Sequence, residues 1–196
     1  MRNKRIFKMI LIALLVALDI VVVRFIPIFS IPGLSSRITL EFLIFVIAGS
    51  MFGITGGVIV GGMGDLIGAL LFPMGVYFFP FTIVNMLRGV LYGAFLKGSL
   101  DRKVKMSNTE LVIRTAGLTF SLIILVNMVI NSGVFLFYKN IMTVNGEGYD
   151  VQLWLFSVIS KIPYESVNAV LYMIIVPMFI LLLRTVMGNQ FFNKRM

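Results

Sequence analysis

The stretch between Glu41 and Arg88 constrains the fold more than any other part of the chain, because Asp65 is its only charged residue. A helix that crosses a bilayer needs about 20 consecutive, mostly apolar residues, and this stretch is long enough for more than one. A carboxylate between two apolar runs is costly in lipid unless it meets a partner or a cavity. The stretch therefore predicts membrane-spanning helices around at least one polar position.

The composition extends this prediction to the whole chain. Of the 196 residues, 59% are hydrophobic and 13% are charged, and the mean hydropathy is +1.03. Soluble domains carry about 25% charged residues. One small core cannot bury this much apolar surface, so lipid must be the solvent, and the predicted fold class is an all-α integral membrane protein.

Several kinds of chemistry are excluded by the residues that the sequence lacks. There is no cysteine and no histidine, which removes disulfides, thiol chemistry and the usual ligands of transition metals. The phosphate-binding pattern GxxxxGK[ST] does not occur, and the only close acidic pair, Glu147 and Asp150, lies in a predicted loop. We therefore predict that this chain is not an enzyme and binds neither a metal nor a cofactor.

The apolar runs predict six spans in a single membrane domain, 1–196. The first follows a basic N-terminus but has no clear small-residue cleavage site, which favours a retained helix over a signal peptide. The long uncharged run that starts at Phe42 is divided by a predicted break near 52–55, and Pro163 and Pro177 predict bends in the last span. The six spans are about 7–28, 39–52, 56–72, 78–96, 111–138 and 158–186.

The basic residues predict the orientation. They gather before the first span, between the fourth and fifth, and after the sixth, and these three segments lie on one side when there are six spans. By the positive-inside rule that side is cytoplasmic, so both termini are expected in the cytoplasm of a bacterium, with the chain a multi-pass protein of the plasma membrane. The net charge is +9, but no basic stripe with interleaved aromatic residues predicts nucleic-acid binding.

Small residues recur every four positions in several predicted helices. Gly49, Gly53, Gly57 and Gly61 show this spacing, which lets helix backbones approach closely in lipid. We expect these glycines to pack helices of the same chain. Ala13 and Ala17 give the same pattern near the cytoplasmic half of the first span, where the face is expected either to pack internally or to dock another membrane protein.

Seven ionisable residues are predicted to lie within or at the edge of the membrane: Asp19, Arg24, Glu41, Asp65, Arg88, Lys161 and Glu165. Such residues face a cavity or a partner. Asp65 and Arg88 lie nearest the predicted midplane, and pairing them would lower the cost of both. Direct contact with a ligand is the alternative for Asp65.

Two polar stripes predict a wet pocket in the outer half of the protein. Lys161, Tyr164, Glu165 and Asn168 follow helical spacing on the sixth span, and Phe81, Asn85 and Arg88 do so on the fourth. The preceding loop, 139–155, carries Trp154, the single tryptophan. It is expected to be a solvated loop with an aromatic anchor or a lid over the pocket.

Residues 36–96 and 161–172 resemble the substrate-binding S component of energy-coupling factor (ECF) vitamin transporters, in the folate and pantothenate branch. The similarity lies in a glycine-rich hairpin and the motifs that follow it. These are Gly64-Asp65, Leu71-Phe72-Pro73, the run from Gly75 to Thr82, and the Gly89–Gly93 pair. Where the family pattern reads PGFT, this chain has Pro80-Phe81-Thr82 without the glycine, which leaves the identity of the ligand open.

The resemblance implies a six-helix S-component bundle that captures a vitamin at the outer face. It implies as partners a transmembrane coupling subunit (EcfT-like), with Ala13 and Ala17 as the docking motif, and two ATPase subunits. ATP would be used by those partners, whose action reorients the S component in the lipid bilayer. The many aromatic residues favour folate as the vitamin, because its pterin ring stacks on such side chains, with pantothenate as the alternative.

The residues expected to contact the vitamin are chosen by chemistry. Cations would bind a carboxylate, aromatic rings would stack on a ring of the vitamin, and amides would bind its hydrogen-bonding edges. Together with the carboxylate at the floor of the pocket, these residues are Arg37, Asp65, Tyr77, Phe79, Phe81, Asn85, Arg88, Trp154, Lys161, Tyr164 and Asn168. A ligand-free assembly or scaffold subunit is the alternative of another class. A stand-alone oligomeric transporter or channel is disfavoured by the apolar inner halves of the fourth and sixth spans.

Overall fold

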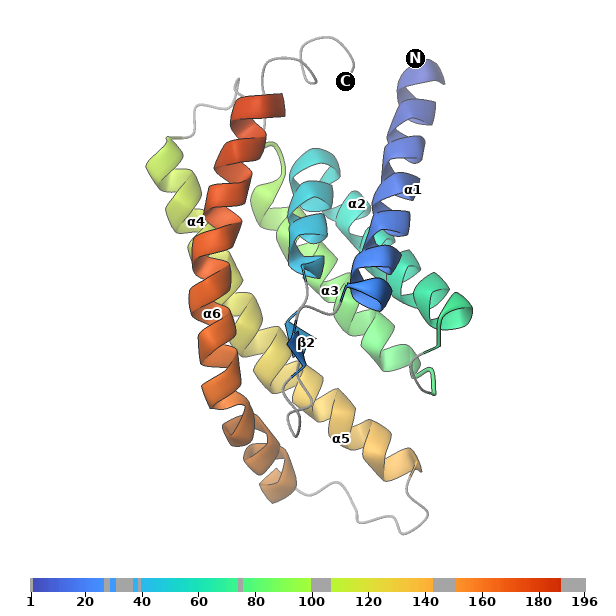
Figure 1. Ribbon diagram of the computed structural model, residues 1–196, viewed down its shortest axis with the longest axis vertical. Helices are drawn as coiled ribbons and strands as arrows, with labels where there is room; N and C mark the ends of the chain where they lie inside the picture. The colour runs from blue at the N-terminus through green and yellow to red at the C-terminus, as the bar shows by residue number, and fades with distance from the viewer. Residues whose placement is uncertain are drawn as a thin grey trace.

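The computed structural model describes residues 2–26, 29–30, 37–38, 40–73, 76–99, 107–142 and 151–187. Within these ranges the chain is almost entirely helical (Figure 1), apart from two short strands that pair antiparallel, with Phe29 opposite Ile38. The elements are α1 (Arg2–Phe25), β1 (Phe29–Ser30), β2 (Arg37–Ile38), α2 (Glu41–Leu71), α3 (Phe79–Leu96), α4 (Asn108–Leu122), the π-helical segment η1 (Ile123–Ile130), α5 (Asn131–Met142) and α6 (Val151–Met187).

Five helices in the described ranges are long and apolar enough to cross a membrane: α1, α2, α3, the continuous helix formed by α4, η1 and α5, and α6. The sequence predicted six, and the difference lies in α2, which joins the predicted spans 39–52 and 56–72. The helix is bent at Gly53, where φ is 69° and ψ is −155°, a conformation that glycine adopts readily. The break therefore falls inside the predicted interval 52–55, and its two halves run in different directions (Figure 1).

The last helix begins earlier than predicted. α6 starts at Val151 rather than near 158, so Trp154 lies within a helix and not in a loop. Pro163 and Pro177 are both accommodated inside α6, as occurs in membrane helices where neighbouring groups satisfy the freed carbonyls. The other part of the predicted lid, 143–150, lies outside the described residues.

Close backbone contact joins α2 to α3. A Cβ atom added at Gly57 would collide with the backbone carbonyl of Gly89, and one added at Gly49 would lie 2.7 Å from the carbonyl carbon of Tyr92. Only glycine permits this approach, and in lipid such packing is a main source of attraction between helices. The glycine spacing was therefore correctly interpreted as packing within the chain.

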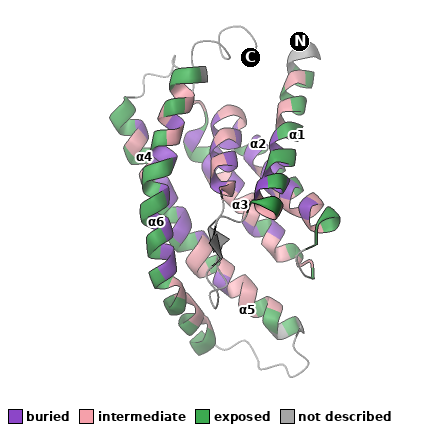
Figure 2. Cartoon of the chain, in the orientation of Figure 1, coloured by how far each residue is buried: buried purple, intermediate pink, exposed green. Residues whose placement is uncertain are grey.

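The remaining helices pack around this pair. One cluster of buried side chains, including Phe45, Leu96 and Val176, joins α2 and α3 to α4 and α6. A second cluster, including Ile20 and Val60, joins α1 to α2. Figure 2 shows exposed residues along the outer faces of α1 and α6, where large apolar side chains are abundant. These faces suit contact with lipid rather than water.

The positions of the helix ends agree with the orientation predicted from the basic residues. The start of α1, the end of α3 with the start of α4, and the end of α6 lie toward the same end of the molecule (Figure 1). These are the three places where the sequence gathers most of its lysines and arginines.

Candidate functional site

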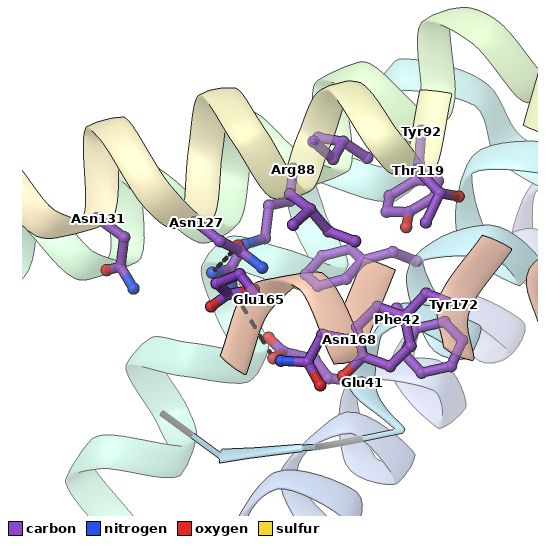
Figure 3. Close-up of a pocket in the computed structure, with 13 residues that line it drawn as sticks. Glu41, Phe42, Arg88, Tyr92, Thr119, Asn127, Asn131, Glu165, Asn168 and Tyr172 are labelled. Carbon is purple, nitrogen blue, oxygen red and sulfur yellow. Dashed lines mark hydrogen bonds and ion pairs between the residues drawn. The ribbon is translucent and has the colours of Figure 1, made fainter. Parts of the chain in front are cut away.

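A cavity of about 260 Å³ lies among α2, α3, the helix formed by α4, η1 and α5, and α6 (Figure 3). One part of its lining is polar and the other is largely aromatic. The polar residues are Glu41, Arg88, Thr119, Asn127, Asn131, Glu165 and Asn168, and the others are Phe42, Phe45, Tyr92, Leu122, Ile123 and Tyr172. Acceptors, donors and rings thus surround one space inside an apolar bundle.

Arg88 is held by residues from three elements. Its Nη1 donates to Oδ1 of Asn85 at 2.7 Å, and its Nη2 donates to Oδ1 of Asn127 at 2.9 Å. Its Nη1 also lies 3.8 Å from Oε2 of Glu41. Because two amides and a carboxylate fix the guanidinium, Arg88 presents a positioned positive charge to the cavity.

The π-helical segment η1 positions two asparagines. Asn127 lies in η1 and Asn131 follows as the first residue of α5, and both line the cavity. π-Helical turns are rare in proteins, and those that occur are often found at functional sites. The Nε1 of Trp154 donates to the carbonyl of Val129 in this segment at 3.4 Å, so α6 contacts the backbone of η1.

Within the described part of the chain, two buried polar side chains of α6 each have one atom without a hydrogen-bond partner. Glu165 is 5% exposed and Asn168 is 3% exposed, and among the described residues neither Glu165 Oε2 nor Asn168 Oδ1 has a hydrogen-bond partner. Buried polar atoms in proteins are almost always hydrogen-bonded. Since both residues line the cavity (Figure 3), a polar ligand would satisfy both acceptors.

Aromatic rings form another part of the lining. Phe42 and Tyr172 lie with their ring centroids 4.1 Å apart, and Phe45 stacks on Tyr92 at 6.2 Å. Figure 3 shows Phe42 and Tyr172 beside Glu41 and Asn168. Such a lining suits a flat, ring-containing ligand whose edges carry hydrogen-bonding groups.

A second cavity of about 220 Å³ lies toward the end of α1 and the start of α3. It is lined by Arg24, Asp65, Tyr77, Phe78 and Phe81, among others. Asp65 accepts a hydrogen bond from Thr82, whose hydroxyl lies 2.7 Å from that of Tyr77. The predicted pairing of Asp65 with Arg88 is therefore wrong, because Arg88 faces Glu41 while Asp65 is bound by Thr82.

The predicted contact residues fall into separate groups. Arg88 and Asn168 line the first cavity, and Asn85 fixes Arg88. Asp65, Tyr77 and Phe81 line the second cavity instead. Phe79, Trp154, Lys161 and Tyr164 line neither of these two cavities, and the side chain of Arg37, in β2, lies outside what the structure describes. Contact of these residues with a ligand stays a prediction.

Several residues of the first cavity were not among the predicted contacts. Glu41 was noted only as a charge in the membrane, Glu165 was noted as part of the polar stripe on the sixth span, and Asn127, Asn131 and Tyr172 were not singled out. Asn127 and Asn131 are four residues apart in an otherwise apolar span, which places them on one helical face. That spacing was the available signal for this wall of the site.

An apolar groove of about 520 Å³ runs between α1 and α2. Ala13 and Ala17 line it together with Met9, Val16 and Met63, and both alanines are exposed. The small-residue face of α1 is therefore turned away from the core of the bundle. Its role as a docking surface stays a prediction.

Comparison with known proteins shows which proteins this chain is similar to. The model of the family of ECF-type riboflavin transporter S components matches residues 3–185. The folate transporter FolT of Clostridium novyi (strain NT) is 33% identical over 129 residues, which cover 66% of this chain and 68% of that protein. A crystal structure of FolT bound with folic acid has a TM-score of 0.55 at 22% identity, covering 94% of this chain and 93% of that chain. This last likeness shows a shared fold.

Proposed function

Because the chain belongs to the family of ECF-type riboflavin transporter S components, we propose that it is the vitamin-binding subunit of an ECF-type ABC importer with folate as its vitamin. The family consists of transporter subunits and not of enzymes. The helices that are long enough to span a membrane fit a multi-pass protein of the cell membrane. The relative FolT is a folate transporter. The first cavity is the proposed site of capture.

The observation that carries the choice of folate is the unpartnered carboxylate oxygen of Glu165 in an aromatic-lined cavity. The pterin ring of folate has a 2-amino group beside an N3–H, so one edge offers two parallel donors. One carboxylate accepts both, as it does from an arginine fork. Phe42 and Tyr172 line the same cavity, and the proposal places them against the face of this ring.

The same chemistry ranks two other vitamins lower. Riboflavin, which the family description names, has a ring edge with one N–H between two carbonyls, and two carboxylates fit that edge less well. Pantothenate has no aromatic ring, and its carboxylate would meet Glu41 and Glu165 as well as Arg88, so two negative charges face it against one positive charge. Folate is also an anion, but its carboxylates lie at the end remote from the pterin ring.

The proposal includes the orientation and the partners. The helix ends that carry most of the basic residues are assigned to the cytoplasm, which turns the end of α1 and the start of α3 outward. A transmembrane coupling subunit docks at Ala13 and Ala17, and two ATPase subunits hydrolyse ATP to drive reorientation. Support comes from the family membership and from the exposed groove on α1.

The test is a titration of the purified protein in detergent with folate, riboflavin and pantothenate, followed by isothermal titration calorimetry. We expect folate to bind at least about tenfold more tightly than either competitor, a difference of about 1.4 kcal/mol. Tighter binding of riboflavin or pantothenate would keep the capture role and overturn the ligand. Binding of none of the three would overturn vitamin capture itself.

A further inference from the structure

The apolar groove between α1 and α2, of about 520 Å³, is larger than either of the two cavities described above. Its α1 wall runs from Met9 to Ile20. Its α2 wall is Ile59, Met63 and Ile67, which are four residues apart and so lie one in each helical turn. Every side chain that lines the groove is apolar, so the groove offers contact to hydrocarbon along its whole length.

The α1 wall of the groove continues into two basic residues toward the N-terminus. Positions 5, 8, 9, 12, 13 and 16 follow the spacing of a single helix face, and the last four of them line the groove. The first two are Arg5 and Lys8, and both are exposed. Within the described part of the chain, neither forms an ion pair. The groove therefore has an apolar body and a cationic end.

The dimensions of the groove favour a thin occupant. Between Met9 and Ile20 α1 rises about 17 Å, and a helix of that length and about 10 Å wide would occupy roughly 1,300 Å³. The groove has less than half of that volume, so a partner helix would lie against its rim and not inside it. An acyl chain is thinner and flexible. It would recover the dispersion contacts that the walls lose when nothing fills the space between them.

The cationic end of the groove indicates the headgroup. Arg5 and Lys8 belong to the start of α1, which lies toward the same end of the molecule as the end of α6 (Figure 1). The positive-inside rule assigns this end to the cytoplasm. Basic residues close to the membrane surface attract anionic lipids. A headgroup with a net negative charge matches two cations, whereas the phosphate of phosphatidylcholine is already offset by its own ammonium group.

We propose that this groove binds one anionic phospholipid of the cytoplasmic leaflet. One acyl chain lies between α1 and α2, and the phosphate lies against Arg5 and Lys8. The same face carries Ala13 and Ala17, the proposed docking motif, so the lipid has to leave the groove before a partner helix can contact the two alanines. The lipid thus competes with assembly and takes no part in the capture of the vitamin.

The test is native mass spectrometry of the full-length protein in detergent, titrated with phosphatidylglycerol or with phosphatidylcholine of the same acyl chains. We expect one phosphatidylglycerol per protein, bound at least about tenfold more tightly than phosphatidylcholine. Arg5→Gln combined with Lys8→Gln should weaken phosphatidylglycerol about tenfold and leave phosphatidylcholine unchanged. Arg114→Gln removes an exposed arginine of α4 and is the matched control, which should change neither affinity.

Two further variants fill the groove from opposite walls. Ala13→Leu combined with Ala17→Leu fills it from α1, and Met63→Trp fills it from α2. Each should weaken phosphatidylglycerol about tenfold, because the acyl chain would be overpacked against the new side chains. Either variant tests the groove if the other fails to fold. Ala94→Leu, at an exposed position of α3, is the control and should bind as the unaltered protein does.

Three results would overturn the inference. The first is equal affinity for the two lipids, or binding of neither. The second is binding of phosphatidylglycerol that survives both groove-filling variants, which would show attraction to the basic surface alone. The third is a dimer in the mass spectrum in place of the lipid complex, which would show that a second copy of this chain covers the groove. None of these results concerns the vitamin, so each leaves the proposed function standing.

Discussion

Arg88 of α3 donates a hydrogen bond from Nη2 to Oδ1 of Asn127 in η1, with an N···O distance of 2.9 Å. The same guanidinium donates to Asn85 and faces Glu41 at the start of α2. One side chain therefore links α2, α3 and the π-helical segment around the first cavity (Figure 3). Its replacement is expected to affect both the shape and the charge of the site.

Replacing Arg88 by glutamine should weaken folate binding at least about tenfold, because it removes a charge-assisted hydrogen bond and the cation that faces Glu41. Lysine should restore little, since an ammonium group lacks the planar fork that reaches two amides. Calorimetric titration of folate measures both effects. Arg114→Gln, at an exposed position of α4, is the matched control, and an Arg88→Gln protein with full affinity would show that this guanidinium has no part in capture.

Replacing Glu165 by glutamine tests the proposed contact with the pterin edge. Glutamine keeps the shape of the side chain but puts one NH₂ donor where two ligand donors need acceptors. Folate affinity should fall by about tenfold or more, within the range for an unsatisfied buried polar group. Glu110→Gln, exposed in the first turn of α4, is the control. Unchanged folate binding by Glu165→Gln would remove Glu165 from the site.

Much of the fold was predictable from local patterns. The glycine spacing indicated the backbone contact between α2 and α3, and the length of the uncharged run indicated a break near 52–55, which the structure locates at Gly53. The joining of two predicted spans in α2 was not predictable, because the length of an apolar run does not show whether helical hydrogen bonding continues across a bend. The early start of α6 was missed because the loop indicated by the polar run NGEGYD, 145–150, was extended to 155, whereas the helix begins at Val151.

The site was less predictable than the fold. The stripe Phe81, Asn85 and Arg88 correctly marked one face of α3, but its members serve two cavities. Charge balance suggested Asp65 as the partner of Arg88, whereas the folded chain brings Glu41 to it. Sequence spacing within one helix shows which residues share a face. Pairing between helices depends on how the helices cross, which spacing does not give.

The contact between Gly57 and Gly89 should be sensitive to a single methyl group. An alanine at Gly57 would press its Cβ into the carbonyl of Gly89, and overpacking of this kind costs about 1–3 kcal/mol. The apparent melting temperature of Gly57→Ala in detergent should therefore fall. Gly117→Ala is the control, because a Cβ there meets nothing within 4 Å and alanine favours the helix by about 1 kcal/mol. Equal melting temperatures for the two variants would contradict the packing role.

The groove on α1 should matter for assembly and not for capture. Leucine at both Ala13 and Ala17 would fill the small-residue face that lines the groove and prevent close approach of a partner helix. When the double variant is co-expressed with the proposed coupling and ATPase subunits, we expect it to lose co-purification with them while it keeps full affinity for folate. Ala94→Leu, at an exposed position of α3, should retain both properties. A double variant that still assembles would show that the partner docks elsewhere, and one that fails to bind folate would show that α1 packs differently when bound.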